Sequence, residues 1–266
     1  MNMKKKVITI SCILIIFIIL LIGTSHISDK LDKINKEKEY KLIVEKYYAD
    51  KLTLYEKENN YYDDYEIDVA FIGDSLTDGY DVSKYYPEFK VVNRGIGGET
   101  TIGLEKRLKV SVFDLKPKVV VMLIGANNMA TMFDNYENIL IKLQTNLPHT
   151  KVVLLSLTSM SKEWGKKNHL ASYNNVIIKK LAEKYNYTFI DLYSPLLNLE
   201  TGELYEEYTF DGGHLTHQGY VVVTDAIKPV LKELLNQNNL WWRIYEISRI
   251  WRNVSRNYIN IKEKRY

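Results

Sequence analysis

The sequence predicts an α/β fold built around a parallel sheet, and two observations carry this prediction. Short apolar runs rich in Val, Ile and Leu alternate along the chain with longer stretches of helical character. Several runs, such as VVVMLIG at residues 119–125, are apolar throughout, which is typical of strands buried on both faces of a parallel sheet. The predicted strands occupy residues 67–72, 90–92, 118–124, 151–157 and 188–190.

Composition narrows the class of protein. A chain of 266 residues with 46% apolar and 26% charged residues is an ordinary globular protein, which excludes disorder throughout. The formal net charge of +3 is too small to indicate a nucleic-acid partner. The single cysteine, Cys12, lies in the first apolar run, so no disulfide framework, zinc-binding CxxC pair or thiol nucleophile is available to the rest of the chain.

Residues 1–27 are predicted to form an N-terminal signal anchor, a transmembrane helix. MNMKKK precedes an uncharged apolar run at 7–23, which is at the short limit for a membrane span and longer than the usual core of a cleaved signal. No AxA-like cleavage site follows, and lysines directly precede the run but are absent just after it. We therefore expect a single-pass protein of the cell membrane whose remainder is extracytoplasmic. The alternative is secretion after signal cleavage.

Three further segments follow the anchor. Residues 28–65 are rich in Lys, Glu, Asp and Tyr and lack Pro and Gly, which predicts a polar helical stalk. Residues 66–236 hold the predicted strands and form the main domain. Residues 237–266 are predicted to form a basic amphipathic helix, whose apolar stripe comprises Leu240, Ile244, Ile247, Trp251, Val254, Tyr258 and Ile261. This helix either lies on an anionic membrane surface or packs against the protein, and periodicity leaves both open.

Four sequence blocks follow predicted strands or lie near the end of the domain. They read FIGDSLTDGY at 71–80, VVNRGIGGETT at 91–101, VVVMLIGANNMA at 119–130 and YTFDGGHLTHQGY at 208–220. An open α/β sheet builds its site at the carboxyl ends of its strands, so we expect these blocks to meet. In their order and spacing they resemble the conserved blocks of the SGNH, or GDSL-type, serine hydrolases.

The resemblance covers residues 67–235 and implies both a fold and a site. The implied fold is three-layer α/β/α with a central, mostly parallel five-stranded sheet, the flavodoxin-like arrangement of SGNH hydrolases. In the implied site Ser75 is the nucleophile, His214 the general base and Asp211 the group that orients the imidazole. The implied oxyanion hole consists of the backbone N–H groups of Ser75 and Gly98 and the side-chain amide of Asn127.

Other polar residues of these blocks are expected to support the loops. Asp74 and Asn93 are predicted to brace turns through hydrogen bonds. Asn128 stands where the family commonly has aspartate, which changes how its loop is braced but not the proposed chemistry. His217 has no aspartate three residues earlier, so we expect a structural role or a place at the edge of the substrate site. The remaining histidines, His26, His149 and His169, have no such context and are expected at the surface.

The implied reaction is two-step acyl transfer that requires no cofactor and no metal. The expected substrates are small acyl esters, chiefly O-acetyl groups on cell-surface carbohydrate. Two alternatives stay open: a lysophospholipase or thioesterase acting on lipid, and an O-acetyltransferase that uses the same triad. A glycan-binding protein without catalysis fits less well, because every triad residue is present. The sequence gives neither the acyl length nor the oligomeric state.

Overall fold

The structure is a computed structural model that describes residues 3–236 together with 242, 244, 245, 247, 248, 250 and 251. These residues divide into two compact units, Met1–Lys51 and Leu52–Tyr266. The predicted C-terminal helix at 237–266 therefore lies largely outside the described residues. Within its described part, the ring of Tyr245 packs edge-on against Tyr65 with 5.0 Å between ring centroids, and Trp242 is buried.

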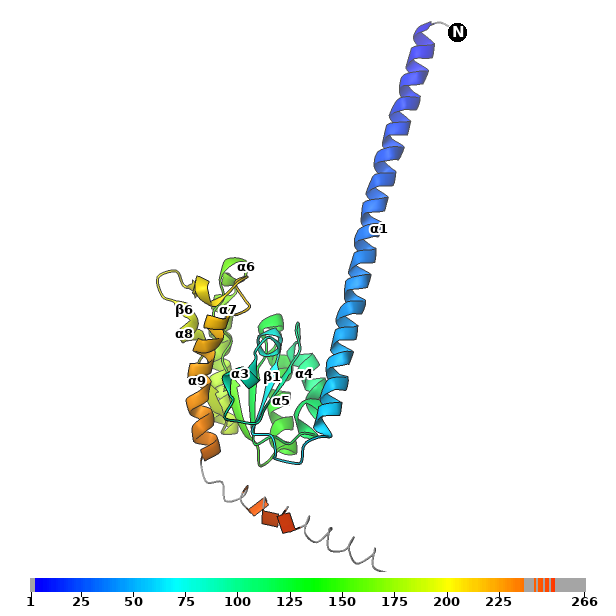
Figure 1. Ribbon diagram of the computed structural model, residues 1–266. Helices are drawn as coiled ribbons and strands as arrows, with labels where there is room; N and C mark the ends of the chain where they lie inside the picture. The colour runs from blue at the N-terminus through cyan, green and yellow to red at the C-terminus, as the bar shows by residue number, and fades with distance from the viewer. Residues whose placement is uncertain (1–2, 237–241, 243, 246, 249, 252–266) are drawn as a thin grey trace, which may run out of the picture. The chain divides into compact units, whose positions relative to one another are not determined.

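Helix α1 runs without interruption from Met3 to Asn59 (Figure 1). It spans the predicted boundary between anchor and stalk and ends six residues before the predicted end of the stalk. Its polar middle part is exposed and carries an ion pair between Lys41 and Glu45, which lie about one helical turn apart. Among the residues that were described, no helix combines the length and apolar character needed to cross a membrane. Residues 52–59 of α1 belong to the second compact unit.

The second unit contains a five-stranded sheet in the order β2-β1-β3-β4-β5, with every pairing parallel. This confirms the predicted central parallel sheet. The strands are β1 (Val69–Gly73), β2 (Val91–Gly95), β3 (Val119–Leu123), β4 (Lys151–Leu155) and β5 (Thr188–Ile190). Every residue of the central strands β1 and β3 is buried, as continuous apolar runs require.

Strand β2 extends further than the sequence predicts. It continues through Asn93, Arg94 and Gly95, where polar residues ended the predicted run. The Asn93 side chain donates to the carbonyl oxygens of Thr77 and Tyr80, at 2.6 and 2.9 Å. Arg94 is fully buried and also has side-chain partners. Polar residues therefore continue the strand because neighbouring elements satisfy most of their hydrogen-bonding groups, and among the described residues Arg94 Nε is the exception.

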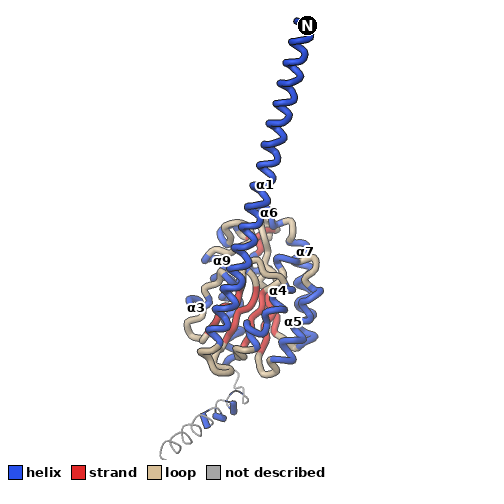
Figure 2. The backbone as a smooth tube through the Cα atoms, turned by 90° about the vertical axis from the view of Figure 1, so that its right-hand side faces the viewer, coloured by secondary structure: helices blue, strands red, loops and turns tan. Residues whose placement is uncertain are grey.

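Helices cover both faces of the sheet, which gives the three layers (Figure 2). On one face α4 (Thr101–Leu108), α5 (Phe133–Asn146) and α7 (Asn168–Tyr185) pack against the even-numbered residues of β1 and β3. On the other face α9 (His217–Asn236) covers the odd-numbered residues. Tyr86, which directly follows α3 (Val82–Tyr85), packs on the same face. Successive side chains of a strand point to opposite faces, so each strand contributes to both cores.

Short elements occupy the connections between the main strands and helices. They are α2 (Ser75–Asp78), a π-helical turn (Lys109–Phe113), a 3₁₀ turn (Ala126–Asn128), α6 (Lys162–Gly165), α8 (Tyr193–Leu196), a second 3₁₀ turn (Glu206–Tyr208) and the hairpin of β6 (Leu197–Asn198) and β7 (Glu203–Leu204). The first and third of these lie within the sequence blocks, and the sixth ends at the first residue of the last block.

Candidate active site

Ser75 is the first residue of α2, directly after β1 ends at Gly73. Asp74 caps this short helix, since its carboxylate oxygen Oδ1 accepts the backbone N–H of Leu76 at 3.1 Å. Asp74 thus braces the loop, while the half-buried Ser75 side chain is left to face the site.

His214 and Asp211 come from the loop before α9 and meet Ser75 across 139 positions of the chain. His214 Nε2 lies 2.9 Å from Ser75 Oγ, and His214 Nδ1 lies 2.6 Å from Asp211 Oδ2. The other carboxylate oxygen of Asp211 accepts the backbone N–H groups of Gly213 and His214, at 2.9 and 2.7 Å. The structure therefore brings the predicted hydroxyl, imidazole and carboxylate into one hydrogen-bonded chain.

The carboxyl group of Asp211 is held in its ionised form. Burial raises its pKa, but the hydrogen bonds from the His214 side chain and from the backbone of His214 and Gly213 outweigh this and lower the pKa to about 2. An ionised carboxylate only accepts hydrogen bonds, so the proton between the two groups resides on His214 Nδ1. In the neutral form of the imidazole, Nε2 then presents a lone pair to the serine hydroxyl.

A tight turn after β2 carries the predicted oxyanion glycine. The N–H of Glu99 donates to the carbonyl of Ile96 at 3.2 Å, and Gly98 occupies the third position of this turn with φ of 76°. A type II turn requires that backbone conformation, which favours glycine. Gly98 is exposed, and a Cβ built on it would meet nothing within 4 Å. Its N–H donates to no acceptor among the described residues.

Asn127 lies in the 3₁₀ turn that follows β3. Its amide nitrogen Nδ2 donates one hydrogen bond to the carbonyl of Glu99 at 2.9 Å. An amide nitrogen carries two hydrogens, so the second stays available. The three predicted oxyanion donors thus lie in loops that follow β1, β2 and β3, which are neighbours in the sheet.

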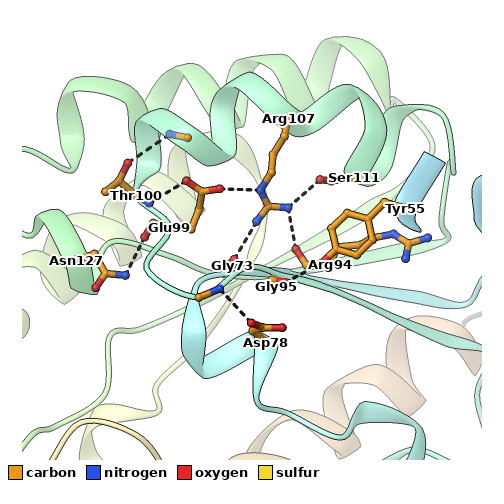
Figure 3. A network of polar contacts seen from close by, with 12 residues as sticks. Tyr55, Gly73, Asp78, Arg94, Gly95, Glu99, Thr100, Arg107, Ser111 and Asn127 are labelled. Carbon is orange, nitrogen blue, oxygen red and sulfur yellow. Dashed lines mark hydrogen bonds and ion pairs between the residues drawn. The ribbon is translucent and has the colours of Figure 1, made fainter. Parts of the chain in front are cut away.

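A buried network supports this turn and was not predicted from the sequence (Figure 3). The guanidinium of Arg107 donates to Glu99 Oε2 at 2.9 Å, to the carbonyls of Arg94 and Gly73 at 2.8 and 2.9 Å, and to Ser111 Oγ at 2.8 Å. The side chains of Arg107 and Glu99 are 1% and 6% exposed. One side chain therefore ties the end of the nucleophile strand to the turn that carries Gly98. The sequence offers no signal for it, because an arginine in a helical stretch is ordinarily solvated.

The side chain of Asn128 joins its loop to the start of α4. Its Oδ1 accepts the N–H of Thr101 at 3.3 Å and its Nδ2 donates to Thr101 Oγ1 at 2.9 Å. The Asn128 amide thus accepts from the backbone and donates to the hydroxyl of one residue, and a carboxylate here would instead accept from both. His217 lies apart from the triad, where its Nδ1 is 2.5 Å from the hydroxyl of Tyr85.

Asp74 differs from the other carboxylates near the site. It is 1% exposed, and its Oδ2 has no hydrogen-bond partner among the described residues. Burial raises the pKa of Asp74 to about 7, against the opposing hydrogen bond from Leu76.

Two exposed aromatic side chains lie beside the triad and were not predicted. The ring of Phe210 stacks on His214 with centroids 5.9 Å apart and planes inclined by 12°. Phe210 is 66% exposed. Trp164 is 42% exposed, and its ring would lie 3.5 Å from a Cβ at Gly213, between Asp211 and His214. The Nζ of Lys162 donates to the carbonyl of Phe210 at 3.0 Å, which links α6 to the loop of the triad. Within the described part of the chain, no cluster of His, Cys, Asp and Glu could hold a metal ion.

A hydroxyl activated by an imidazole, which a carboxylate orients, defines a serine hydrolase. The model of the GDSL-like Lipase/Acylhydrolase family matches residues 71–222, and the chain belongs to this family. None of the curated proteins compared with the chain matches it.

Solved structures share the fold over most of their length. A protein from Streptococcus pneumonia, provisionally described as a platelet activating factor, is 25% identical with a TM-score of 0.66, covering 73% of this chain and 97% of that one. A GDSL-like lipase from Bacteroides thetaiotaomicron is 25% identical with a TM-score of 0.60, covering 68% and 97%. A variant of an acetyl xylan esterase from Geobacillus stearothermophilus is 21% identical with a TM-score of 0.52, covering 65% and 96%, and shows the shared fold.

Proposed function

We propose that the chain is a membrane-anchored extracytoplasmic esterase that hydrolyses small acyl esters, chiefly O-acetyl groups on carbohydrate, through an acyl-Ser75 intermediate. The observation that carries the proposal is the hydrogen-bonded chain from Ser75 Oγ to His214 Nε2 at 2.9 Å and from His214 Nδ1 to Asp211 at 2.6 Å. Activity as an acylhydrolase follows from the family, whereas the residue roles, substrate and location are proposed.

In the first step Ser75 Oγ attacks the ester carbonyl while His214 Nε2 accepts its proton. Asp211 stabilises the resulting imidazolium and holds its orientation. The oxyanion that forms accepts hydrogen bonds from the N–H groups of Ser75 and Gly98 and from Asn127 Nδ2. His214 then gives the proton to the departing alcohol. In the second step water attacks the acyl group with His214 again as base, which releases the acid and restores Ser75.

One feature supports a sugar as the alcohol part of the substrate. The exposed ring of Phe210 beside the base offers a flat apolar surface on which the apolar face of a sugar ring can stack.

The location is proposed on the sequence alone. The uncharged run at 7–23 and the lysines before it support an anchor whose N-terminus is cytoplasmic. Fractionation of cells that express the full chain is expected to place it in the membrane pellet, with the catalytic domain open to protease added outside. Recovery of the full chain in the soluble fraction would overturn the anchor, and a shortened secreted chain would indicate cleavage.

The substrate is tested with the purified full chain. Nitrophenyl esters of increasing acyl length and an acetylated oligosaccharide are compared, with Ser75→Ala as the inactive control. We expect acetate to be released fastest and Ser75→Ala to be inactive. Preference for long chains would favour the lipid hydrolase, and transfer of acetyl to an added sugar faster than release of acetate would favour the transferase. Activity retained by Ser75→Ala would refute the proposed nucleophile.

A further inference from the structure

The end of helix α1 is joined to the strand that leads into the Gly98 turn. Tyr55 is 1% exposed, and its hydroxyl donates to the carbonyl of Gly95, the last residue of β2, at 2.6 Å (Figure 3). The residues matched by the family model begin at position 71, so this helix lies before them. Nothing in the family match assigns a role to it.

The contact extends to the preceding strand residue, Arg94, which is 0% exposed. Its guanidinium lies 4.6 Å from the centroid of the Tyr55 ring and pairs with the carboxylate of Glu58. It also donates to the side-chain oxygen of Asn59 at 3.1 Å. Asn59 in turn donates to the carbonyl of Val110 at 2.7 Å. The end of α1 therefore holds two consecutive residues at the exit of β2 through a charged, aromatic and hydrogen-bonded contact.

This contact matters because the Gly98 amide is not held directly. It lies in open space and makes no protein hydrogen bond among the described residues, so its position depends on the residues on either side. After it, Glu99 is fixed by Arg107 at 2.9 Å and by Asn127 at 2.9 Å. Before it, the chain is fixed at three successive residues: the Gly97 N–H donates to Asp78 Oδ2 at 3.1 Å, the Ile96 N–H donates to the Gly73 carbonyl at 3.1 Å, and the Gly95 carbonyl accepts the Tyr55 hydroxyl.

We propose that Tyr55 is a positioning residue of the oxyanion hole, which fixes the start of the turn so that the Gly98 N–H points at the developing oxyanion. The inference rests on the oxyanion role proposed above for Gly98. An oxyanion donor acts only when it is already aimed at the charge that forms, so a small displacement of the turn lowers the rate. A purely structural anchor would change stability and leave the rate constant of the folded protein unchanged.

The test is Tyr55→Phe in the full chain, which removes one hydroxyl and keeps the ring under Arg94. We expect kcat to fall about fivefold, the factor that corresponds to one hydrogen bond of typical net strength, with KM unchanged. A boronic acid that forms a tetrahedral adduct with Ser75 is expected to bind weaker by the same factor. An uncleavable amide analogue of the substrate is expected to bind as to wild type.

Tyr136→Phe is the matched control. Tyr136 is a fully buried residue of α5, and its hydroxyl has no partner among the described residues. This variant therefore removes the same hydroxyl oxygen, but from a residue that makes no hydrogen bond to the turn. Its kcat should stay within about twofold of wild type, because no hydrogen bond is lost. A second variant, Glu58→Gln, removes the charge that pairs with Arg94 and should lower kcat and boronate affinity together.

The outcomes separate this inference from the proposed function. If Ser75→Ala is inactive while folded Tyr55→Phe and Glu58→Gln turn over at the wild-type rate, the end of α1 is only an anchor and the inference is wrong. If Ser75→Ala stays active, the proposed function fails first. Circular dichroism at the assay temperature establishes that each variant is folded.

Discussion

The buried pair of Arg107 and Glu99 gives a prediction whose magnitude follows from the structure. Replacing Arg107 by methionine removes four hydrogen bonds and leaves the Glu99 carboxylate, 6% exposed, without its cation. Breaking a buried ion pair by removing one partner costs about 3–5 kcal/mol. We therefore expect the free energy of unfolding of Arg107→Met to fall by about that amount.

A double variant distinguishes the lost attraction from the charge left behind. When Glu99→Leu is added to Arg107→Met, no unpaired charge remains in the interior. About 2 kcal/mol or more of the lost stability should return, because apolar residues often replace a buried pair without loss. Urea unfolding of wild type, both single variants and the double variant measures this coupling.

Activity should not return with stability. The Glu99 side chain also accepts the N–H of Thr100 at 3.1 Å, so it shapes the chain directly after Gly98. Loss of a well-aimed oxyanion donor costs about a hundredfold or more in kcat, and a displaced turn should cost at least about tenfold. Hydrolysis of nitrophenyl acetate by the folded double variant is thus expected to remain slow.

An exposed pair provides the control for both measurements. Lys109 and Asp114 form an ion pair whose side chains are 78% and 40% exposed. Lys109→Met should change stability by less than about 1 kcal/mol, since exposed pairs contribute little. Our reasoning is refuted if Arg107→Met is no more destabilising than Lys109→Met. It is also refuted if the double variant recovers stability and kcat together.

Three further predictions address the donors, the titration and the extent of the domain. Asn127→Ala should lower kcat by about a hundredfold or more with little change in KM, measured with nitrophenyl acetate. Burial raises the pKa of Asp74 from 3.8 to about 7, so its contribution to stability is greatest below pH 4 and is lost as the pH rises to 7. Asp74→Asn should therefore gain stability over wild type progressively between pH 4 and pH 8 in urea titrations. A chain that begins at Asp64 lacks Tyr55 and should hydrolyse esters more slowly than one that begins at Leu52, and equal kcat values would contradict this.

The parts of the fold that the sequence predicts are those set by local patterns. Continuous apolar runs give β1 and β3 to within two residues at either end, because a strand buried on both faces excludes polar residues. Parallel pairing then places the following loops at one edge of the sheet, which is why blocks far apart in sequence could be expected to meet. The 2.9 Å contact between Ser75 Oγ and His214 Nε2 shows that the first and the last of these blocks meet.

The parts that escape prediction are buried polar contacts between distant elements. Arg107 reads as a solvated residue of an amphipathic helix, and only the fold shows that its guanidinium turns inward to Glu99 and Gly73. The contact of Phe210 with the imidazole likewise depends on the loop conformation. Such contacts have no period in the sequence, since each partner is fixed by topology rather than by spacing.

The end of α1 reads as solvated stalk for a similar reason, and the sheet order explains why it is not. In the order β2-β1-β3-β4-β5, β2 is an edge strand, so one of its sides has no neighbouring strand. Edge strands leave backbone groups unpaired unless another element covers them. The Tyr55 hydroxyl supplies a partner for the Gly95 carbonyl at this edge. The same strand leads into the Gly98 turn, so the end of α1 both covers the edge of the sheet and holds that turn. The folded domain therefore includes the end of α1, which precedes the first strand.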